Sequence, residues 1–410
     1  MRIDGVEATP GSAPSEEELL RRVDELAPLI RDHVDWQEAH RRMAPEVFDA
    51  LARSGMFSLW KPRAVGGYET HPVIALKVFE ALSRIDASVG WAVANQDGVD
   101  TMTGAVLDGP GALEILADPR LPVSGASFPP GVAHRVDGGY VVSGRWPFSS
   151  TCHGAQALMG VAVLHDENGP VTGPGGLPVR LLVYSKDDLD AKIVEGSWRT
   201  MGMRGSGSND IAMHDVFIAN RHAEIMGRNG ITTEGPFSGP LYAMTPWLSI
   251  ATSGPVGLGI AEAAIDALGE LASTKTPNHT TRALRDRDHT QAVMGRCRAI
   301  VNGARIYLHT SVERVYDARS AGRKPNKAAH LDVQLATCAA LEAGPQVVQM
   351  VHEVVGSSGF REGLHFQQLL RDSHTIGQNT FASTVRYEAC GQVLLGMPTD
   401  WGLLAWGLAR

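Results

Sequence analysis

A long apolar stripe near the C-terminus constrains the fold of this chain more than any other feature. Its residues recur at gaps of three or four positions: Val293, Cys297, Ile300, Val301, Ala304, Leu308, Val312 and Val315. This spacing keeps one face of an α-helix apolar over roughly six turns. A second stripe consists of Leu331, Leu335, Cys338, Val347, Val348, Val351 and Val355. Long antiparallel helices with short connections predict a four-helix bundle, and Gly344-Pro345 is expected to kink or divide the second helix.

Helices are also expected in the first part of the chain. Ser15 precedes three glutamates, which is typical of a capped helix start with acids in the first turn. Apolar residues then follow at helical spacing up to Ile30. Pro45 is expected to open a short helix that Gly55 closes, and a further helix is expected over 72–84.

The middle of the chain has a different pattern, with frequent glycine and proline between short apolar runs. Asp137-Gly138-Gly139 predicts a hairpin turn, and further strands are expected over 157–164, 180–184 and 211–218. We therefore predict a helical domain at 1–120, a central all-β domain, barrel or sandwich, at 121–235, and a four-helix bundle at 236–410. The fold class is mainly α with a central β-domain.

Composition limits the possible partners of this 410-residue chain. Lys+Arg number 37 and Asp+Glu 45, a formal net charge of −8, which disfavours nucleic acid or an anionic membrane as partner. The four cysteines lie far apart, so neither a disulfide framework nor a metal site is indicated. The start has no apolar signal-peptide core, and no uninterrupted apolar run reaches about 18 residues. We expect a cytoplasmic protein.

Two segments carry candidate chemistry. Residues 202–210 are rich in glycine and could meet a phosphate or a flat ring, or could simply form a loop entering the next strand. Trp146-Pro147-Phe148 precedes three hydroxyl residues, 149–151, which suits a planar heterocycle or, alternatively, a capped strand end. No H-E-x-x-H, Walker loop or G-x-S-x-G elbow is present.

Taken in order, these segments resemble the acyl-CoA dehydrogenase superfamily over nearly the whole chain, from about Ala44 to Trp401. The resemblance is greatest to the two-component, group D flavin-dependent monooxygenases, in particular to the branch acting on indole-acetate-like compounds. The segments that carry it are 82–91, 138–150, 198–210 and 371–378, and the third of these is the most specific. The fold so implied has an N-terminal helical domain, a central β-barrel or sandwich and a C-terminal four-helix bundle.

The resemblance also implies roles for individual residues. Ser150 matches the neighbour of flavin N5, with Phe148 and Ser149 beside it, and Ser127 matches the first flavin contact of the β-domain. The other flavin residues so implied are Trp198, Arg204, Ser206, Ser208, Asn209, and, across a subunit interface, Arg282, Gln291, Gly356 and Gly359.

The reactive region is expected to include His374 and Asn379. Relatives commonly have a histidine at the position of Asn379, and another near Asp100; an asparagine can hold a hydroxyl but cannot act as a base. His153 is a possible replacement. Low-specificity candidates for the substrate pocket are Trp91, Asn95, Tyr242 and Trp247.

The function so implied is a monooxygenase that uses reduced flavin (FADH₂ or FMNH₂) and O₂. A flavin C4a-hydroperoxide passes oxygen to an aromatic, heteroaromatic or amine small molecule, and a separate NAD(P)H-flavin reductase supplies the flavin. The resemblance implies a homo-oligomer, usually a tetramer. Two alternatives stay open: a flavin dehydrogenase or oxidase like the acyl-CoA dehydrogenases, and a scaffold without activity. No carboxylate occurs in 375–381, where the dehydrogenases place their catalytic base, which disfavours the first alternative.

Overall fold

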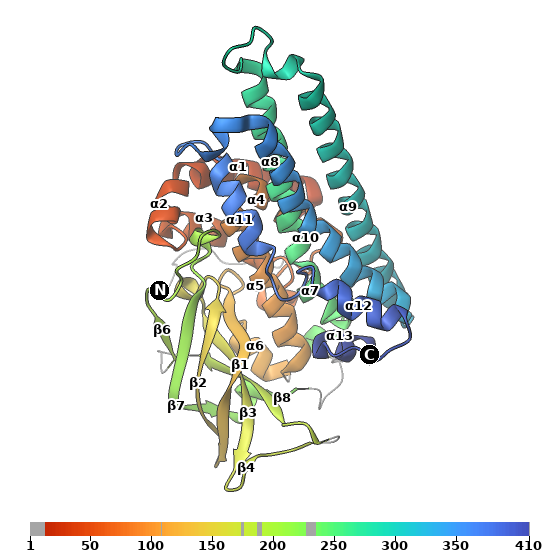
Figure 1. Cartoon of the computed structure of the whole chain (residues 1–410). Coiled ribbons are helices and arrows are strands. Elements are labelled where there is room, and N and C mark those ends of the chain that lie inside the picture. Colours follow the sequence, from red (N-terminus) through yellow and green to blue (C-terminus); the bar gives the residue numbers. More distant parts are fainter. Residues whose placement is uncertain (1–12, 108, 174–175, 187–190, 227–234, 410) are drawn as a thin grey trace.

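The structure is a computed structural model that describes the chain except for residues 1–12, 108, 174–175, 187–190, 227–234 and 410 (Figure 1). Helices come first, a sheet follows and longer helices complete the chain. This order confirms the predicted fold class. The exact domain limits at 120 and 235 stay a prediction, although α6 ends at Ile115, β1 begins at Val123 and β8 ends at Ile225.

The N-terminal helices are positioned by identifiable caps. Ser15 accepts a hydrogen bond from the Glu18 amide at 3.2 Å, as the sequence predicts, and Asp86 caps α5 by accepting from Val89 at 2.9 Å. The α-helices of this part are α1 (Glu16–Asp32), α2 (Val34–His40), α3 (Pro45–Arg53), α4 (Pro72–Ile85), α5 (Ala87–Val106) and α6 (Gly109–Ile115).

The central strands all belong to one mixed sheet, in the order β6-β7-β2-β1-β3-β5-β8, with β4 paired to β3. The predicted hairpin joins β1 to β2, with Val136 opposite Gly139. The pair β1–β3 is parallel and the other pairs are antiparallel. The strands are β1 (Val123–Val136), β2 (Gly139–Ser149), β3 (Ala157–Asp166), β4 (Gly169–Pro170), β5 (Arg180–Lys186), β6 (Lys192–Val194), β7 (Asn209–Ala219) and β8 (Ala223–Ile225).

The C-terminal helices form the predicted bundle, and α10 runs through Gly344-Pro345 without a break. The alternative that this pair divides the helix is therefore wrong. A Cβ at Gly257 of α8 would meet the main chain at Ala340 and Leu341 of α10, so the two helices touch backbone to backbone. The helices are α7 (Trp247–Ala251), α8 (Ser253–Thr274), α9 (Asp288–Ser320), α10 (Lys327–Val355), α11 (Phe366–Ile376), α12 (Arg386–Leu394) and α13 (Gly402–Ala409).

One helical stretch of the described residues, Trp247–Thr274, is long and apolar enough to cross a membrane. Most of it (94%) is buried inside the protein. The core helix of a bundle has the same composition, because its side chains are enclosed by neighbouring helices.

Candidate functional site

A buried cluster of hydroxyl groups lies where β2 ends. The Ser150 side chain is 2% exposed, and its Oγ lies 3.0 Å from Trp91 Nε1 of α5 and 2.8 Å from Ser208 Oγ. Ser208 Oγ lies 2.7 Å from Ser206 Oγ. The structure thus brings together Ser150, Ser206 and Ser208, which the resemblance had assigned to one site.

The carbonyl of Ser150 is held as firmly as its hydroxyl group. It accepts hydrogen bonds from Ser124 Oγ at 2.6 Å and from Gln96 Nε2 at 2.5 Å, while Ser124 Oγ also lies 2.8 Å from Ser149 Oγ. Sequence reasoning missed Ser124 and Gln96, since neither belongs to a motif. Both side chains are fully buried, and a buried polar side chain normally has a hydrogen-bond partner.

The glycine-rich segment packs against three helices. A Cβ at Gly202 would clash with the main chain of α11 at Arg371 and Asp372, and one at Gly205 would press on Gln37 of α2 and Ser88 of α5. These two positions therefore require glycine, because a side chain there would prevent the helices from packing closely against the loop. The loop is wedged between helices, and its serine hydroxyls reach the end of β2.

Asp372 ties α11 to this loop, a role that the sequence did not indicate. Its Oδ1 accepts a 2.6 Å hydrogen bond from the Met203 amide. Burial raises the pKa of the Asp372 carboxyl to about 7, and nearby Glu38 and Asp86 act in the same direction. Next to it, Arg371 pairs with Glu38 at 2.6 Å and donates to the Met201 carbonyl at 2.6 Å.

An exposed aromatic surface adjoins the hydroxyl cluster. Phe148 is 65% exposed, and its φ of 68° is a left-handed conformation that a bulky residue adopts only under constraint. Its ring meets that of Trp198 edge-on at 6.2 Å between centroids. Asn209 holds Trp198, because Asn209 Oδ1 accepts a hydrogen bond from the Trp198 amide at 3.2 Å. Trp198 Nε1 in turn donates to the carbonyls of Met203 and Arg204.

An open aromatic face beside hydroxyl groups suits the ring of a flavin, so the residues present fit that cofactor. Two further residues that the resemblance assigns to the flavin differ in exposure. Ser127 is exposed in β1 next to Phe128, over whose ring the Arg180 guanidinium stands at 5.2 Å. The Arg204 side chain is half-buried, with Nη1 3.6 Å from Glu38.

The two candidates for the reactive region follow one another on α11 and the turn after it. The His374 side chain is exposed. Asn379 accepts from the Phe381 amide at 2.9 Å, a local turn that fixes its side chain. Their roles stay predictions.

Of the four candidate substrate residues, Trp91 contacts Ser150, and Asn95 lies one turn further along α5, half-buried. The other two occupy the core. Tyr242 donates to the Trp60 carbonyl at 3.1 Å, and the Trp247 ring stacks on His330 at 4.8 Å. Packing explains these two without a substrate, and their assignment stays a prediction.

The residues expected to reach a neighbouring subunit belong to two segments, the connection between α8 and α9 with the start of α9, and the turn after α10. Both segments lie at the end of the bundle far from the sheet (Figure 1). Arg282 Nη2 lies 3.2 Å from Asp288, and Gln291 Nε2 donates to the Arg285 carbonyl at 3.1 Å. Lys275 joins this connection to the turn at Gly356–Phe360 by donating to Val355 O at 2.7 Å and Ser358 Oγ at 2.8 Å. Their contribution to a flavin site of a second subunit stays a prediction.

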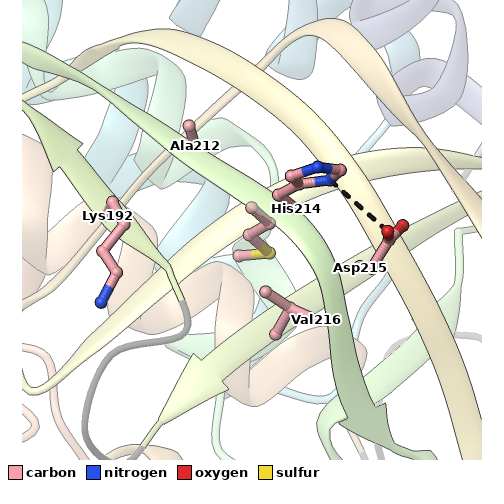
Figure 2. A pocket seen from close by; sticks show the side chains of 6 residues that line it. Lys192, Ala212, His214, Asp215 and Val216 are labelled. Carbon is pink, nitrogen blue, oxygen red and sulfur yellow. Dashed lines mark ion pairs between the residues drawn. The ribbon is translucent and has the colours of Figure 1, made fainter.

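Two hollows occur elsewhere on the described surface. One, of about 400 Å³, lies along β7, and His214 and Asp215 in its lining form an ion pair at 3.6 Å. Figure 2 shows these side chains. The larger, of about 1070 Å³, lies between α1, α4, α8 and α9 and is crossed by salt bridges from Arg305 to Glu80 and Glu262. Neither is lined by any residue that the sequence assigned to the site.

Comparisons with known proteins agree on one family. The model for the acyl-CoA dehydrogenase N-terminal domain matches residues 15–104, and that for the C-terminal domain matches 251–384. Indole-3-acetate monooxygenase of Pseudomonas putida is 28% identical over 95% of this chain and 96% of its own length. The flavin-dependent monooxygenase oxygenase subunit HsaA of Rhodococcus jostii is 30% identical over 60% of this chain and 64% of its own.

A solved structure extends the likeness to the fold. XiaF from a Streptomyces species, in complex with FADH₂ and glycerol, superposes with a TM-score of 0.85 at 22% identity, covering 94% of this chain and 96% of that one.

Proposed function

The chain belongs to the acyl-CoA dehydrogenase superfamily, and we propose that it is the oxygenase component of a two-component, flavin-dependent monooxygenase. Its substrate is an aromatic, heteroaromatic or amine small molecule, and a separate NAD(P)H-flavin reductase supplies the reduced flavin. The names of the relatives support this reading. The observation that carries it is the buried hydroxyl cluster around Ser150 beside the exposed Phe148 ring.

Reduced flavin, when bound, supplies two electrons to O₂, so that one oxygen atom enters the substrate and the other leaves as water. The protein contributes position and water exclusion. Phe148 offers the ring surface, supported edge-on by the buried Trp198, and Ser150 offers a fixed hydrogen-bonding atom for N5. The segment 377–381 after α11 carries no carboxylate that could remove a substrate proton, which argues against acyl-CoA dehydrogenation.

Anaerobic titration with FADH₂ and FMNH₂, followed by an oxygen pulse with candidate aromatic substrates, tests the proposal. We expect tight binding of a reduced flavin, weak binding of the oxidised form, and oxygenated product. Failure to bind either reduced flavin contradicts the proposal. Firmly bound oxidised flavin with dehydrogenation of the substrate favours the dehydrogenase alternative.

Ser150→Ala tests the proposed contact with N5. We expect more hydrogen peroxide per reduced flavin consumed, because the cofactor loses a partner worth about 0.5–1.5 kcal/mol, or roughly 2- to 12-fold in rate. Coupling of product to flavin oxidation is the measurement. Ser143→Ala is the control, since Ser143 lies further back on β2 and bonds to Asp215 at 2.8 Å. Unchanged coupling in Ser150→Ala removes the N5 role.

The proposed enzyme is a homotetramer whose flavin site takes Arg282 and Gln291 from a neighbour. Exposed apolar side chains around α12 support an interface between copies: Val385, Leu394, Leu395 and Met397. Leu395→Asp should weaken assembly by about 1.5–3 kcal/mol per buried copy and with it the affinity for reduced flavin. Sedimentation and flavin titration check this, with Leu177→Asp as the control because Leu177 is also largely exposed but lies in the sheet region. Assembly unchanged in Leu395→Asp contradicts this interface.

A further inference from the structure

The side chains of Trp91, Ser150, Ser208 and Ser206 form a chain of hydrogen bonds in which every donor points the same way. The groups at the two ends of this hydrogen-bond chain set that direction. Ser206 Oγ donates its only hydrogen to the Met203 carbonyl at 2.8 Å. The 2.7 Å contact between Ser206 and Ser208 must therefore be donated by Ser208. By the same reasoning, Ser150 donates the 2.8 Å bond to Ser208.

The donor direction is equally unambiguous at the other end of the hydrogen-bond chain, at Trp91. An indole N–H can only donate, and Trp91 Nε1 donates to Ser150 Oγ at 3.0 Å. The sequence of donors is thus Trp91, Ser150, Ser208 and Ser206, and the final acceptor is a carbonyl. Ser150 Oγ has already used its hydrogen and retains one lone pair, so towards any further group it can act only as an acceptor.

We propose that the fixed direction of this hydrogen-bond chain makes Ser150 favour the binding of reduced over oxidised flavin. Trp91, Ser206 and Ser208 act as positioning residues. The inference rests on the proposed function, in which Ser150 lies beside N5. N5 of a reduced flavin carries a hydrogen and can donate to Ser150 Oγ. N5 of an oxidised flavin has only a lone pair, which faces another acceptor.

The surroundings keep the chain from reversing. The three serines of the hydrogen-bond chain are at most 3% exposed and Trp91 is 8% exposed. Solvent water therefore cannot reach them to act as a substitute donor. The accepting carbonyl belongs to Met203, which is held at a φ of 53° and whose amide donates to Asp372 at 2.6 Å. The direction is therefore anchored in α11 at one end and in α5 at the other.

Ser208→Ala is the decisive variant, because it removes the acceptor of the Ser150 hydrogen and leaves Ser150 itself in place. The freed hydroxyl can then donate to oxidised flavin and still accept from reduced flavin. We expect the ratio of dissociation constants, oxidised over reduced, to fall about 2- to 12-fold through tighter binding of the oxidised form. The midpoint potential of the bound flavin should fall by the equivalent, about 9–32 mV for a two-electron couple.

Ser206→Ala supplies a second test two bonds from Ser150. It frees the Ser208 hydrogen, so Ser208 can donate to Ser150 and the chain can reverse; the ratio should move in the same direction. Ser124→Ala is the matched control, since this buried serine bonds to the Ser150 carbonyl and not to its hydroxyl. Local damage should weaken both flavin forms together and leave the potential unchanged.

The outcomes separate the inference from the function on which it rests. Wild-type protein that binds no reduced flavin contradicts the proposed function. Wild-type protein that prefers reduced flavin, with the same ratio and potential in Ser208→Ala, overturns the directional chain and leaves the function standing. An equal shift in Ser124→Ala overturns it as well, because the effect then does not depend on the hydroxyl.

Discussion

Lys61→Met should destabilise the protein by about 3–5 kcal/mol, the typical result of breaking a buried ion pair from one side. Lys61 and Asp100 are both fully buried, with Nζ 3.0 Å from Asp100 Oδ2. Nζ also donates to the carbonyls of Phe57 and Leu121, each at 2.8 Å. Burial already raises the pKa of Asp100 to about 6, with Lys61 opposing that shift. Without the lysine, the carboxylate must take up a proton or remain unpaired.

Urea unfolding at pH 7 measures this loss, with Lys77→Met as the matched control. Lys77 pairs with Glu16 at 2.7 Å, but both side chains are more than a third exposed, so the control should lose no more than about 1 kcal/mol. Adding Asp100→Leu to Lys61→Met should recover part of the stability. Equal losses in the two single variants contradict a structural role for the buried pair.

This pair also bears on the missing histidine. Asp100 lies near the position where relatives often have a histidine, but its carboxylate is directed to Lys61 and to the start of the sheet rather than to Ser150. The Leu121 carbonyl that Lys61 holds lies just before β1, the strand that carries Ser124. We infer that Asp100 positions the sheet against α5 and does not act as the replacement base.

Asp372→Asn should make stability less dependent on pH. The pKa of the buried Asp372 carboxyl is raised to about 7, whereas the unfolded chain releases this proton near 3.8. Between these values the folded state holds a proton that the unfolded state has lost, so stability falls as pH rises from about 4 to 7. Asparagine keeps an acceptor for the Met203 amide and has no proton to lose.

We therefore expect Asp372→Asn to gain on wild type by an amount on the order of 1–4 kcal/mol between pH 4.5 and pH 8. Free energies of unfolding from urea titrations at the two pH values give the difference. Asp215→Asn is the control, because the Asp215 side chain is exposed and its Oδ1 accepts a hydrogen bond from Ser143 Oγ that an asparagine can also accept. A gain for Asp372→Asn that is the same at both pH values would show that the carboxyl does not hold its proton in the folded protein.

Parts of the candidate site could be predicted and parts could not. The segments 146–151 and 198–210 were assigned to one site because their residue types match a family, and the structure brings them together at Ser150, Ser206 and Ser208. The glycines illustrate the limit of that reading. Gly202 and Gly205 are compatible with a ligand-binding loop. In the structure, however, their lack of a side chain lets neighbouring helices pack closely against the loop. Asp372 belongs to the segment 371–378, which carries the family resemblance, yet only its contact with Met203 shows what it does.

The sequence by itself determined the local elements and their order. Helical spacing predicted α9 and α10, Ser15 predicted the start of α1, and Asp137-Gly138 predicted the first hairpin, because each signal involves residues a few positions apart. The tertiary structure alone decided that Trp91, Ser150 and Ser208 meet in one chain of hydrogen bonds. These residues come from α5, from the end of β2 and from a loop wedged against α11. A hydroxyl group carries no periodic signal of its distant partner, so the direction of its hydrogen is set only when packing brings donor and acceptor together.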